Sequence, residues 1–209
     1  LSKILPDAGF LTEEATTKKE NKNLFWIIDP LDGTTNFIHN LPSFGISIAL
    51  ANQEELLLGV VMEPNMDECY YACKGGGAFC NQKAIKVTSN HKIADCLFGT
   101  GFPINNHETI SNYLDITKYL VRNTRGVRRF GSASIDLIYT ACGRFDAFFE
   151  YNLKPWDVAG GAIIVKEAGG QITDFKGGED WLYGKTIIAS NKHIHTSILS
   201  IIEQEYYKS

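Results

Sequence analysis

Short apolar segments separated by polar turns dominate the first half of the sequence. The connections are short, whereas parallel neighbouring strands would need long crossovers. The pattern therefore predicts an antiparallel meander, preceded by a polar and mixed segment over residues 1–23. Runs rich in β-branched and aromatic residues predict strands at residues 24–29, 44–51, 56–63, 68–73 and 84–87, with turns between them that include residues 75–83.

The second half of the sequence alternates helical patterns with short strands. Apolar residues at helical spacing predict helices over residues 107–122, 132–143, 156–170 and 192–206. Apolar runs predict strands over residues 144–151, 171–175 and 186–190. Since no regular βαβ period is visible, the expected fold class is α+β, a layered α/β/α/β sandwich with a mostly antiparallel first sheet.

Composition narrows the functional classes. The chain has 209 residues, 44% of them hydrophobic, which is enough to bury a core. Its net charge of −4 and the lack of a basic block make nucleic acid an unexpected partner. No apolar run is long enough for a membrane span, so no membrane partner is expected. The five cysteines include no CxxC pair and have no histidine at ligand spacing, so we interpret them as small apolar residues in a reducing, cytoplasmic compartment rather than a zinc site.

Two carboxylates follow the first apolar strand. Asp29 and Asp32 lie in WIIDPLDGTTNF, residues 26–37, and buried carboxylates are costly unless they are paired or bind a metal. Asp32 is a suitable N-cap for a helix that starts at Gly33. The amides of Gly33, Thr34 and Thr35 would then be free to bind an anion. In the simpler alternative, Asp32 is only a helix cap and Asp29 only a turn residue.

Acidic residues at two further places strengthen the metal hypothesis. Glu13 and Glu14 lie just before the first predicted strand, and Asp157 lies in the first turn of an apolar helix. Alone, a Glu-Glu pair is usually solvated surface and Asp157 would be helix-dipole compensation. Together they form an all-oxygen set of the kind that Mg²⁺ or Mn²⁺ prefers. Enzymes commonly use two such ions to catalyse displacement at phosphorus.

Three motifs resemble those of the inositol monophosphatase family: TEE at residues 12–14, DPLDGTTNF at 29–37 and WDVAGG at 156–161. They occur in the family's order, and the similarity runs from Phe10 to the C-terminal helix. The resemblance implies the sugar-phosphatase sandwich as a single domain over residues 1–209. Residues 1–100 would form the metal-site half and residues 101–209 the half that supplies Asp157. It also implies Mg²⁺ dependence, with Mn²⁺ as a possible substitute, and inhibition by Li⁺.

The same resemblance implies roles for individual residues. One metal would be held by Glu13, Asp29 and the Leu31 carbonyl, and a second by Asp29, Asp32 and Asp157. Glu13, helped by Thr34, would position the attacking water, which makes Glu13, Thr34 and Asp29 the catalytic set.

The substrate side is implied in the same way. The Gly33 and Thr34 amides would bind the phosphate, and Glu150 would accept hydrogen bonds from sugar hydroxyls. In simpler alternatives, Ser132 only caps its helix and Glu150 is an exposed strand residue. The full set of implied substrate contacts is Asp32, Gly33, Thr34, Gly131, Ser132, Ala133, Glu150 and Asp157.

GTTNF, residues 33–37, resembles the inositol phosphatase branch, so inositol monophosphate is the favoured member of a class of small phosphorylated polyols and sugars. Alternatives within the superfamily are fructose-1,6-bisphosphatase and 3′-phosphoadenosine 5′-phosphate phosphatase. A different alternative is a non-catalytic partner of RNA polymerase, a role known for one bacterial relative. We expect a homodimer. Because the family begins with two helices ahead of the Glu-Glu motif, we also expect an N-terminally truncated chain.

Overall fold

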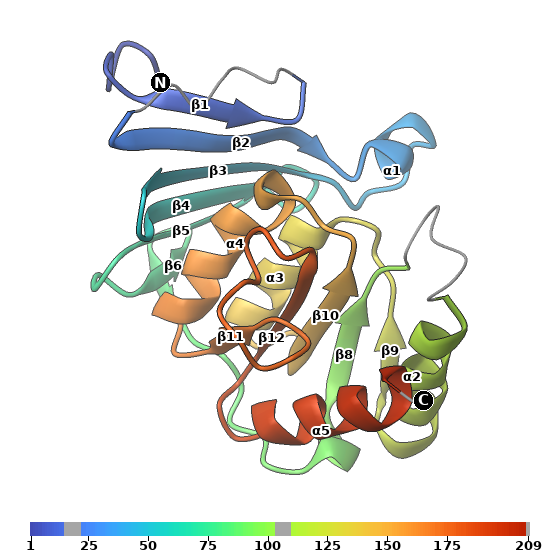
Figure 1. Cartoon of the computed structure of the whole chain (residues 1–209). Coiled ribbons are helices and arrows are strands. Elements are labelled where there is room, and N and C mark those ends of the chain that lie inside the picture. Colours follow the sequence, from blue (N-terminus) through green and yellow to red (C-terminus); the bar gives the residue numbers. More distant parts are fainter. Residues whose placement is uncertain (15–21, 103–109, 208–209) are drawn as a thin grey trace.

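Two β-sheets with a pair of helices between them form the frame of the structure (Figure 1). The computed structural model describes residues 1–14, 22–102 and 110–207. Two further helices cover the free face of one sheet, so the layers follow the order helix, sheet, helix, sheet. The predicted α/β/α/β sandwich is therefore confirmed.

The first sheet comes from the N-terminal half of the chain. β1 pairs parallel with β2, and the other neighbouring pairs are antiparallel, which confirms a mostly antiparallel sheet. Its seven strands follow each other in space as in sequence: β1 (Gly9–Thr12), β2 (Leu24–Asp32), β3 (Gly45–Asn52), β4 (Leu56–Glu63), β5 (Glu68–Cys73), β6 (Ala78–Cys80) and β7 (Lys83–Ile85).

A local irregularity at the end of β2 brings two aspartates to one side of the sheet. Asp29 pairs with Ser47, but Asp32 pairs with Gly45, and the register shifts between them. Pro30 lies in this interval and has no amide hydrogen for the ladder. Residues three apart in a regular strand face opposite sides, so the irregularity is what allows both carboxylates to face the same cleft. The short helix α1 (Thr34–Ile38) follows directly.

Helices α3 (Ala133–Ala141) and α4 (Pro155–Glu167) fill the space between the sheets. The residues of α4 from Val158 to Val165 are buried on every side, as expected for a helix that is apolar all round. Glycines permit its close packing, because a β-carbon at Gly160 would lie 2.5 Å from Ser47 Oγ. This approach sets the N-terminal end of α4 near the end of β2.

The second sheet belongs to the C-terminal half. Helices α2 (Ile110–Asn123) and α5 (His195–Tyr206) pack against its outer face, where Phe98 and Phe149 meet Ile116 and Ile198 in one cluster. Its strands lie in the order β11 (Gln171–Thr173), β12 (Thr186–Ser190), β10 (Ala147–Tyr151), β8 (Leu97–Thr100) and β9 (Gly126–Arg128).

The outer face of the first sheet carries an apolar cluster around Trp26 and Leu50. Leu5 and Ala8 contact this cluster, and no helix of the described residues packs on it (Figure 1). In the same part of the chain, no helix is both long and apolar enough to cross a membrane.

Several short elements differ from the sequence-based expectation. Residues 1–23, expected to be polar and mixed, contain β1, and the turn expected over residues 75–83 contains β6. Strands β8 and β9 were also not predicted. Each of these four has three or four residues, too few to show a clear alternation of apolar and polar positions. The helix expected over residues 107–122 begins by Ile110, and residues 107–109 lie outside the described part of the chain.

We expect Gly160→Ala to lower the free energy of unfolding by about 1–3 kcal/mol, because the added β-carbon overpacks the contact with Ser47. Urea denaturation would measure the change. Gly9→Ala is the matched control, since its β-carbon would meet the nearest atom, Phe25 Cβ, at an ordinary 3.5 Å. Equal stability of the two variants would contradict a packing role for Gly160.

Candidate active site

The predicted site residues meet in one cleft at the end of β2. The cleft has a volume of about 220 Å³ and is bordered by the segment after β1, the turn before α1, the start of α3, the end of β10 and the first turn of α4. The structure thus brings together every residue of the predicted site. The predicted residues lining the cleft are Glu13, Asp29, Leu31, Asp32, Gly33, Thr34, Gly131, Ser132, Ala133, Glu150 and Asp157.

Asp29 and Asp32 are held by different parts of the chain. The Leu31 amide donates to Asp29 Oδ1 at 2.9 Å, so Asp29 is fixed by its own turn. Asp32 Oδ2 instead accepts from Ser132 Oγ at 2.6 Å and from the Ser134 amide at 2.7 Å. Asp32 therefore ties the end of β2 to the start of α3.

The N-terminus of α1 is capped differently from the sequence-based expectation. The N-cap is Gly33, with no side-chain cap, and Asp32 is the last residue of β2. Gly33 has φ of 90°, and a β-carbon there would lie 2.8 Å from the Ser43 carbonyl oxygen, so both backbone and packing favour glycine. The interpretation of Asp32 as only a helix cap is wrong. Ser132 occupies the N-cap position of α3 but makes no side-chain cap hydrogen bond, and its hydroxyl binds Asp32 instead.

Asp157 enters the cleft from α4. Its Oδ2 accepts a hydrogen bond from the Lys154 amide at 2.7 Å, which stabilises the start of the helix. The carboxylate also lines the cleft, so the capping role and a role in the site do not exclude each other. Glu13 is exposed and lines the cleft, while the neighbouring Glu14 is exposed and does not line it.

The carboxylates are crowded and partly removed from water. Burial, followed by the charge of Asp32, raises the pKa of Asp29 to about 8, and Glu13 and Asp157 add to this. Burial is also the main cause that raises the pKa of Asp157 to about 7. Burial raises the pKa of Asp32 despite its hydrogen bonds to Ser132 and Ser134. A cation in this cleft would relieve both the repulsion and the desolvation.

The donor set fits a hard divalent cation. The candidate ligands in the cleft are all oxygen atoms. In the hydrogen bonds seen in the described residues, each of the three aspartates, Asp29, Asp32 and Asp157, uses a single carboxylate oxygen. Across those residues, no three His, Cys, Asp or Glu side chains are already gathered tightly enough to hold an ion. The carboxylates are thus oriented toward a common cleft rather than preassembled into a closed cage.

Glu150 also lines the cleft. It is half-buried near the end of β10, and a β-carbon at Gly101 would overlap its carboxylate. Burial, and then the charges of Asp32 and Asp157, raise the pKa of Glu150 to about 8. The alternative of a simply exposed strand residue is therefore wrong.

Sequence reasoning missed other residues that line the cleft. Asn36 is buried and its Nδ2 donates to the carbonyl oxygens of Ser43, at 2.6 Å, and Phe130, at 2.7 Å, which fastens α1 to the segment before α3. Arg129 also faces the cleft. Neither belongs to a periodic pattern, and the contact between α1 and Phe130 joins distant parts of the chain.

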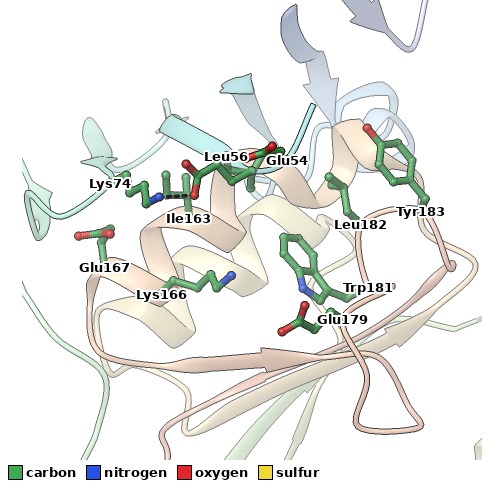
Figure 2. A pocket seen from close by; sticks show the side chains of 11 residues that line it. Glu54, Leu56, Lys74, Ile163, Lys166, Glu167, Glu179, Trp181, Leu182 and Tyr183 are labelled. Atoms are coloured by element: carbon green, nitrogen blue, oxygen red, sulfur yellow. Dashed lines mark hydrogen bonds and ion pairs between the residues drawn. The ribbon is translucent and has the colours of Figure 1, made fainter. Parts of the chain in front are cut away.

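A larger cavity, of about 430 Å³, lies on the far side of α4 (Figure 2). Its Lys74 pairs with Glu55, and Lys166 lies 5.4 Å from the centre of the Trp181 ring. Glu167 accepts hydrogen bonds from the amides of two glycines in the turn after β5. Since these charges serve contacts within the protein, the acidic cleft is the better candidate for chemistry.

The sequence model described as "Inositol monophosphatase family" matches residues 1–207. The chain is 41% identical over 205 residues to "Inositol-1-monophosphatase" of Mesorhizobium japonicum, covering 98% of this chain and 77% of that protein. It is 47% identical over 177 residues to "Putative Nus factor SuhB" of Neisseria meningitidis serogroup B, covering 85% and 68%. The solved structure of inositol monophosphatase from Anabaena (Nostoc) sp. PCC 7120 superposes with a TM-score of 0.93 at 35% identity, covering 98% of this chain and 81% of that one.

We expect the metal-free protein to lose stability as pH rises from about 5 to 8. In this range folded Asp29 and Asp157 retain protons, with pKa values of about 8 and about 7, while unfolded aspartates have released theirs near pH 4. The folded state then binds more protons than the unfolded state, so raising the pH favours unfolding. Thermal melts in chelator at several pH values would measure this.

Adding Mg²⁺ at pH 8 should raise the melting temperature, because bound ligand stabilises the folded state. Asp32→Asn should reduce both the pH dependence and the Mg²⁺ effect. Glu203→Gln, on the exposed face of α5, is the control and should change neither. Melting temperatures that do not respond to pH or Mg²⁺ would contradict the picture of crowded carboxylates.

Proposed function

Since the chain belongs to the inositol monophosphatase family, we propose that its acidic cleft hydrolyses phosphate monoesters, with inositol monophosphate as the favoured substrate. One observation carries the proposal. Carboxylates from three separate segments, after β1, at the end of β2 and at the start of α4, line the same cleft, where burial and then the neighbouring charges raise the pKa of Asp29. Oxygen donors gathered in this way suit divalent cations and, with them, phosphate.

Mg²⁺, or Mn²⁺ in its place, would be held by Glu13, Asp29, the Leu31 carbonyl, Asp32 and Asp157. When bound, such ions supply positive charge and Lewis acidity for displacement at phosphorus. Phosphate monoester hydrolysis is extremely slow without a catalyst, so a large stabilisation of the transition state is needed. The family resemblance adds the expectation that Li⁺ inhibits the reaction.

The chain's own groups would bind and orient the reactants. Glu13 would accept a hydrogen bond from the attacking water, helped by Thr34. The Thr34 hydroxyl donates to the Leu31 carbonyl oxygen at 2.9 Å, so these two groups lie side by side at the metal end of the cleft. The Gly33 and Thr34 amides would bind the phosphate oxygens. No protein nucleophile is required.

The other end of the cleft would recognise the alcohol part of the substrate. Glu150 is a hydrogen-bond acceptor at the wall of the cleft, and Gly131, Ser132 and Ala133 border it at the start of α3. A small polyol offers several hydroxyl donors to such a wall, which supports inositol monophosphate over an unfunctionalised ester. Fructose-1,6-bisphosphatase and 3′-phosphoadenosine 5′-phosphate phosphatase activities are the alternatives within the superfamily.

A second candidate function is a regulatory one. It is favoured by the 47% identity over 177 residues to a relative named as a putative Nus factor, beside the 41% identity over 205 residues to the inositol-1-monophosphatase of M. japonicum. A regulatory partner of RNA polymerase would not need the carboxylates to bind a cation. The expected homodimer and cytoplasmic location stay predictions under either function.

The proposal predicts phosphate release that depends on Mg²⁺ or Mn²⁺ and stops in excess chelator. Inositol 1-phosphate, fructose 1,6-bisphosphate and 3′-phosphoadenosine 5′-phosphate would be compared in a phosphate-release assay. Asp32→Asn removes a charge at constant size and should abolish turnover while circular dichroism stays unchanged. Turnover that persists in chelator would contradict the metal role. A folded wild type that hydrolyses none of the esters would favour the regulatory candidate.

At about pH 9, above the pKa of about 8 of Glu150, Glu150→Gln should lower kcat/KM for inositol 1-phosphate by about ten- to a hundred-fold, because a charge-assisted hydrogen bond from a substrate hydroxyl to the ionised carboxylate is worth about 1.5–3 kcal/mol. An aryl phosphate without hydroxyls should lose much less, since the metal end of the cleft is untouched. Steady-state kinetics on both substrates would measure the ratio. An equal loss on the two would assign Glu150 to the fold or the metal site, and no loss on either would remove its role in polyol recognition.

A further inference from the structure

A buried carboxyl group in α3 has no role in the function proposed above. Asp136 is 0% exposed, and neither oxygen of its carboxyl group has a hydrogen-bond partner among the described residues. A buried polar group without a partner lowers stability, and such groups are rare in native structures. An apolar residue at this position would avoid that cost, so the carboxyl group calls for a functional explanation.

Helix α3 places Asp136 on the inner face of the second sheet, where Glu150 also lies. Phe148 of β10 packs with residues of α3 in the cluster between the sheets. Glu150 is two residues further along the same strand and therefore points to the same face. Asp136 approaches this face from α3, because a β-carbon at Gly99 of β8 would lie 3.1 Å from Asp136 Oδ1.

Two glycines of the neighbouring strand make room for the two carboxyl groups. In the pairing of β10 with β8, Phe148 lies opposite Gly99. The same register sets Glu150 beside Gly101, and a β-carbon at Gly101 would overlap the Glu150 carboxylate. Positions two residues apart on a strand share a face and are about 7 Å apart. The carboxyl groups of Asp136 and Glu150 thus occupy adjacent gaps, at a separation that one water can bridge.

Asp136 keeps its proton in this environment. Burial, followed by the charge of Glu150, raises the pKa of Asp136 well above its usual range, and the opposite effect of the Arg129 charge is smaller. The other titratable groups that act on it are Asp32 at the end of β2 and Tyr113 of α2. A neutral carboxyl group can donate a hydrogen bond, whereas an ionised one can only accept.

Glu150 differs from the other acids of the cleft in how it is held. Asp29, Asp32 and Asp157 each accept hydrogen bonds from described residues. By contrast, no hydrogen bond from a described residue contributes to the pKa of Glu150. A donor behind Glu150 would supply the orientation that the other carboxylates receive from the backbone or from Ser132.

We propose that Asp136 is a positioning residue for Glu150. Its neutral carboxyl group donates a hydrogen bond, through one water, to the Glu150 carboxylate. This bond orients the carboxylate toward the cleft and favours its ionised form, which accepts hydrogen bonds from the hydroxyls of a polyol phosphate. The consequence for substrates rests on the proposed phosphatase function, whereas the link between the two carboxyl groups can be measured without a substrate.

Three variants separate this role from packing. Asp136→Leu is similar in size and cannot donate, whereas Asp136→Asn is neutral and keeps a donor. Thr140→Val is the matched control: Thr140 is a buried polar residue one turn later in α3, and its hydroxyl donates within the helix, to the Asp136 carbonyl oxygen at 2.9 Å.

The first test is a carbon-13 NMR titration of the glutamate side chains in Mg²⁺, with the Glu150 signal assigned through Glu150→Gln. In Asp136→Leu, Glu150 should titrate about 0.5–1 pH unit higher than in the wild type, because its ionised form has lost a donor. Asp136→Asn and Thr140→Val should titrate as the wild type does.

The second test compares kcat/KM for inositol 1-phosphate and for an aryl phosphate without hydroxyls. Near pH 7, below the Glu150 pKa of about 8, Asp136→Leu should lose about 3- to 10-fold on inositol 1-phosphate, because a smaller fraction of Glu150 is ionised. The loss on the aryl phosphate should stay within about 2-fold, since that substrate does not use Glu150. Asp136→Asn should restore the wild-type ratio between the two substrates.

Other results would overturn the proposal. A lower pKa of Glu150 in both Asp136→Leu and Asp136→Asn would show that Asp136 is ionised and repels Glu150. An unchanged titration in Asp136→Leu, or an equal loss on both substrates, would leave Asp136 with a packing role. If circular dichroism shows that Asp136→Leu does not fold, Asp136→Ala takes its place, because alanine also lacks a donor and needs less space.

The titration also separates this inference from the proposed function. If the wild type hydrolyses none of the esters but Glu150 titrates higher in Asp136→Leu, the phosphatase function falls and the link between the carboxyl groups stands. If the esters are hydrolysed but the titration of Glu150 does not depend on Asp136, the link falls and the phosphatase function stands.

Discussion

Mutual repulsion among partly buried carboxylates is the constraint on which the rest of this site depends. Asp29, Asp32 and Asp157 come from two elements and are brought into one cleft with Glu13, where burial and neighbouring charge raise the pKa of Asp29 and Asp157. Such an arrangement costs free energy in the absence of a cation. The fold must supply that free energy through packing elsewhere, so the stability of the sandwich and the chemistry of the cleft are linked.

The hydrogen bonds that hold each carboxylate show this link between the fold and the site. Asp29 is held by the amide of its own turn, Asp157 by the first turn of α4, and Asp32 by α3. The glycines of α4 allow that helix to lie close to the first sheet, and Asp157 of its first turn lines the same cleft as Asp29. Each carboxylate uses one oxygen for these hydrogen bonds. Its orientation is therefore fixed without using up the oxygen atoms that a cation would need as ligands.

Sequence reasoning reached the long elements and the acidic residues, but not the contacts that join distant parts of the chain. The strands of the meander and helices α3, α4 and α5 have enough residues for their periodicity to be recognised. β1 has four residues, and its parallel pairing with β2 depends on a partner beyond the local pattern. The capping role expected for Asp32 was wrong for a similar reason: its partner, Ser134, lies 102 residues away. Local sequence shows which residue types are available for capping, while tertiary packing decides which contact forms.

The proposed function assigns different parts of the substrate to two ends of the cleft. At one end, crowded carboxylates favour cations and, through them, an anionic phosphate. At the other end, Glu150 offers a hydrogen-bond acceptor for substrate hydroxyls. Under the proposed function, discrimination between phosphate esters would therefore depend on the groups near Glu150 more than on the metal-site carboxylates, which would bind the phosphate that all of these esters share.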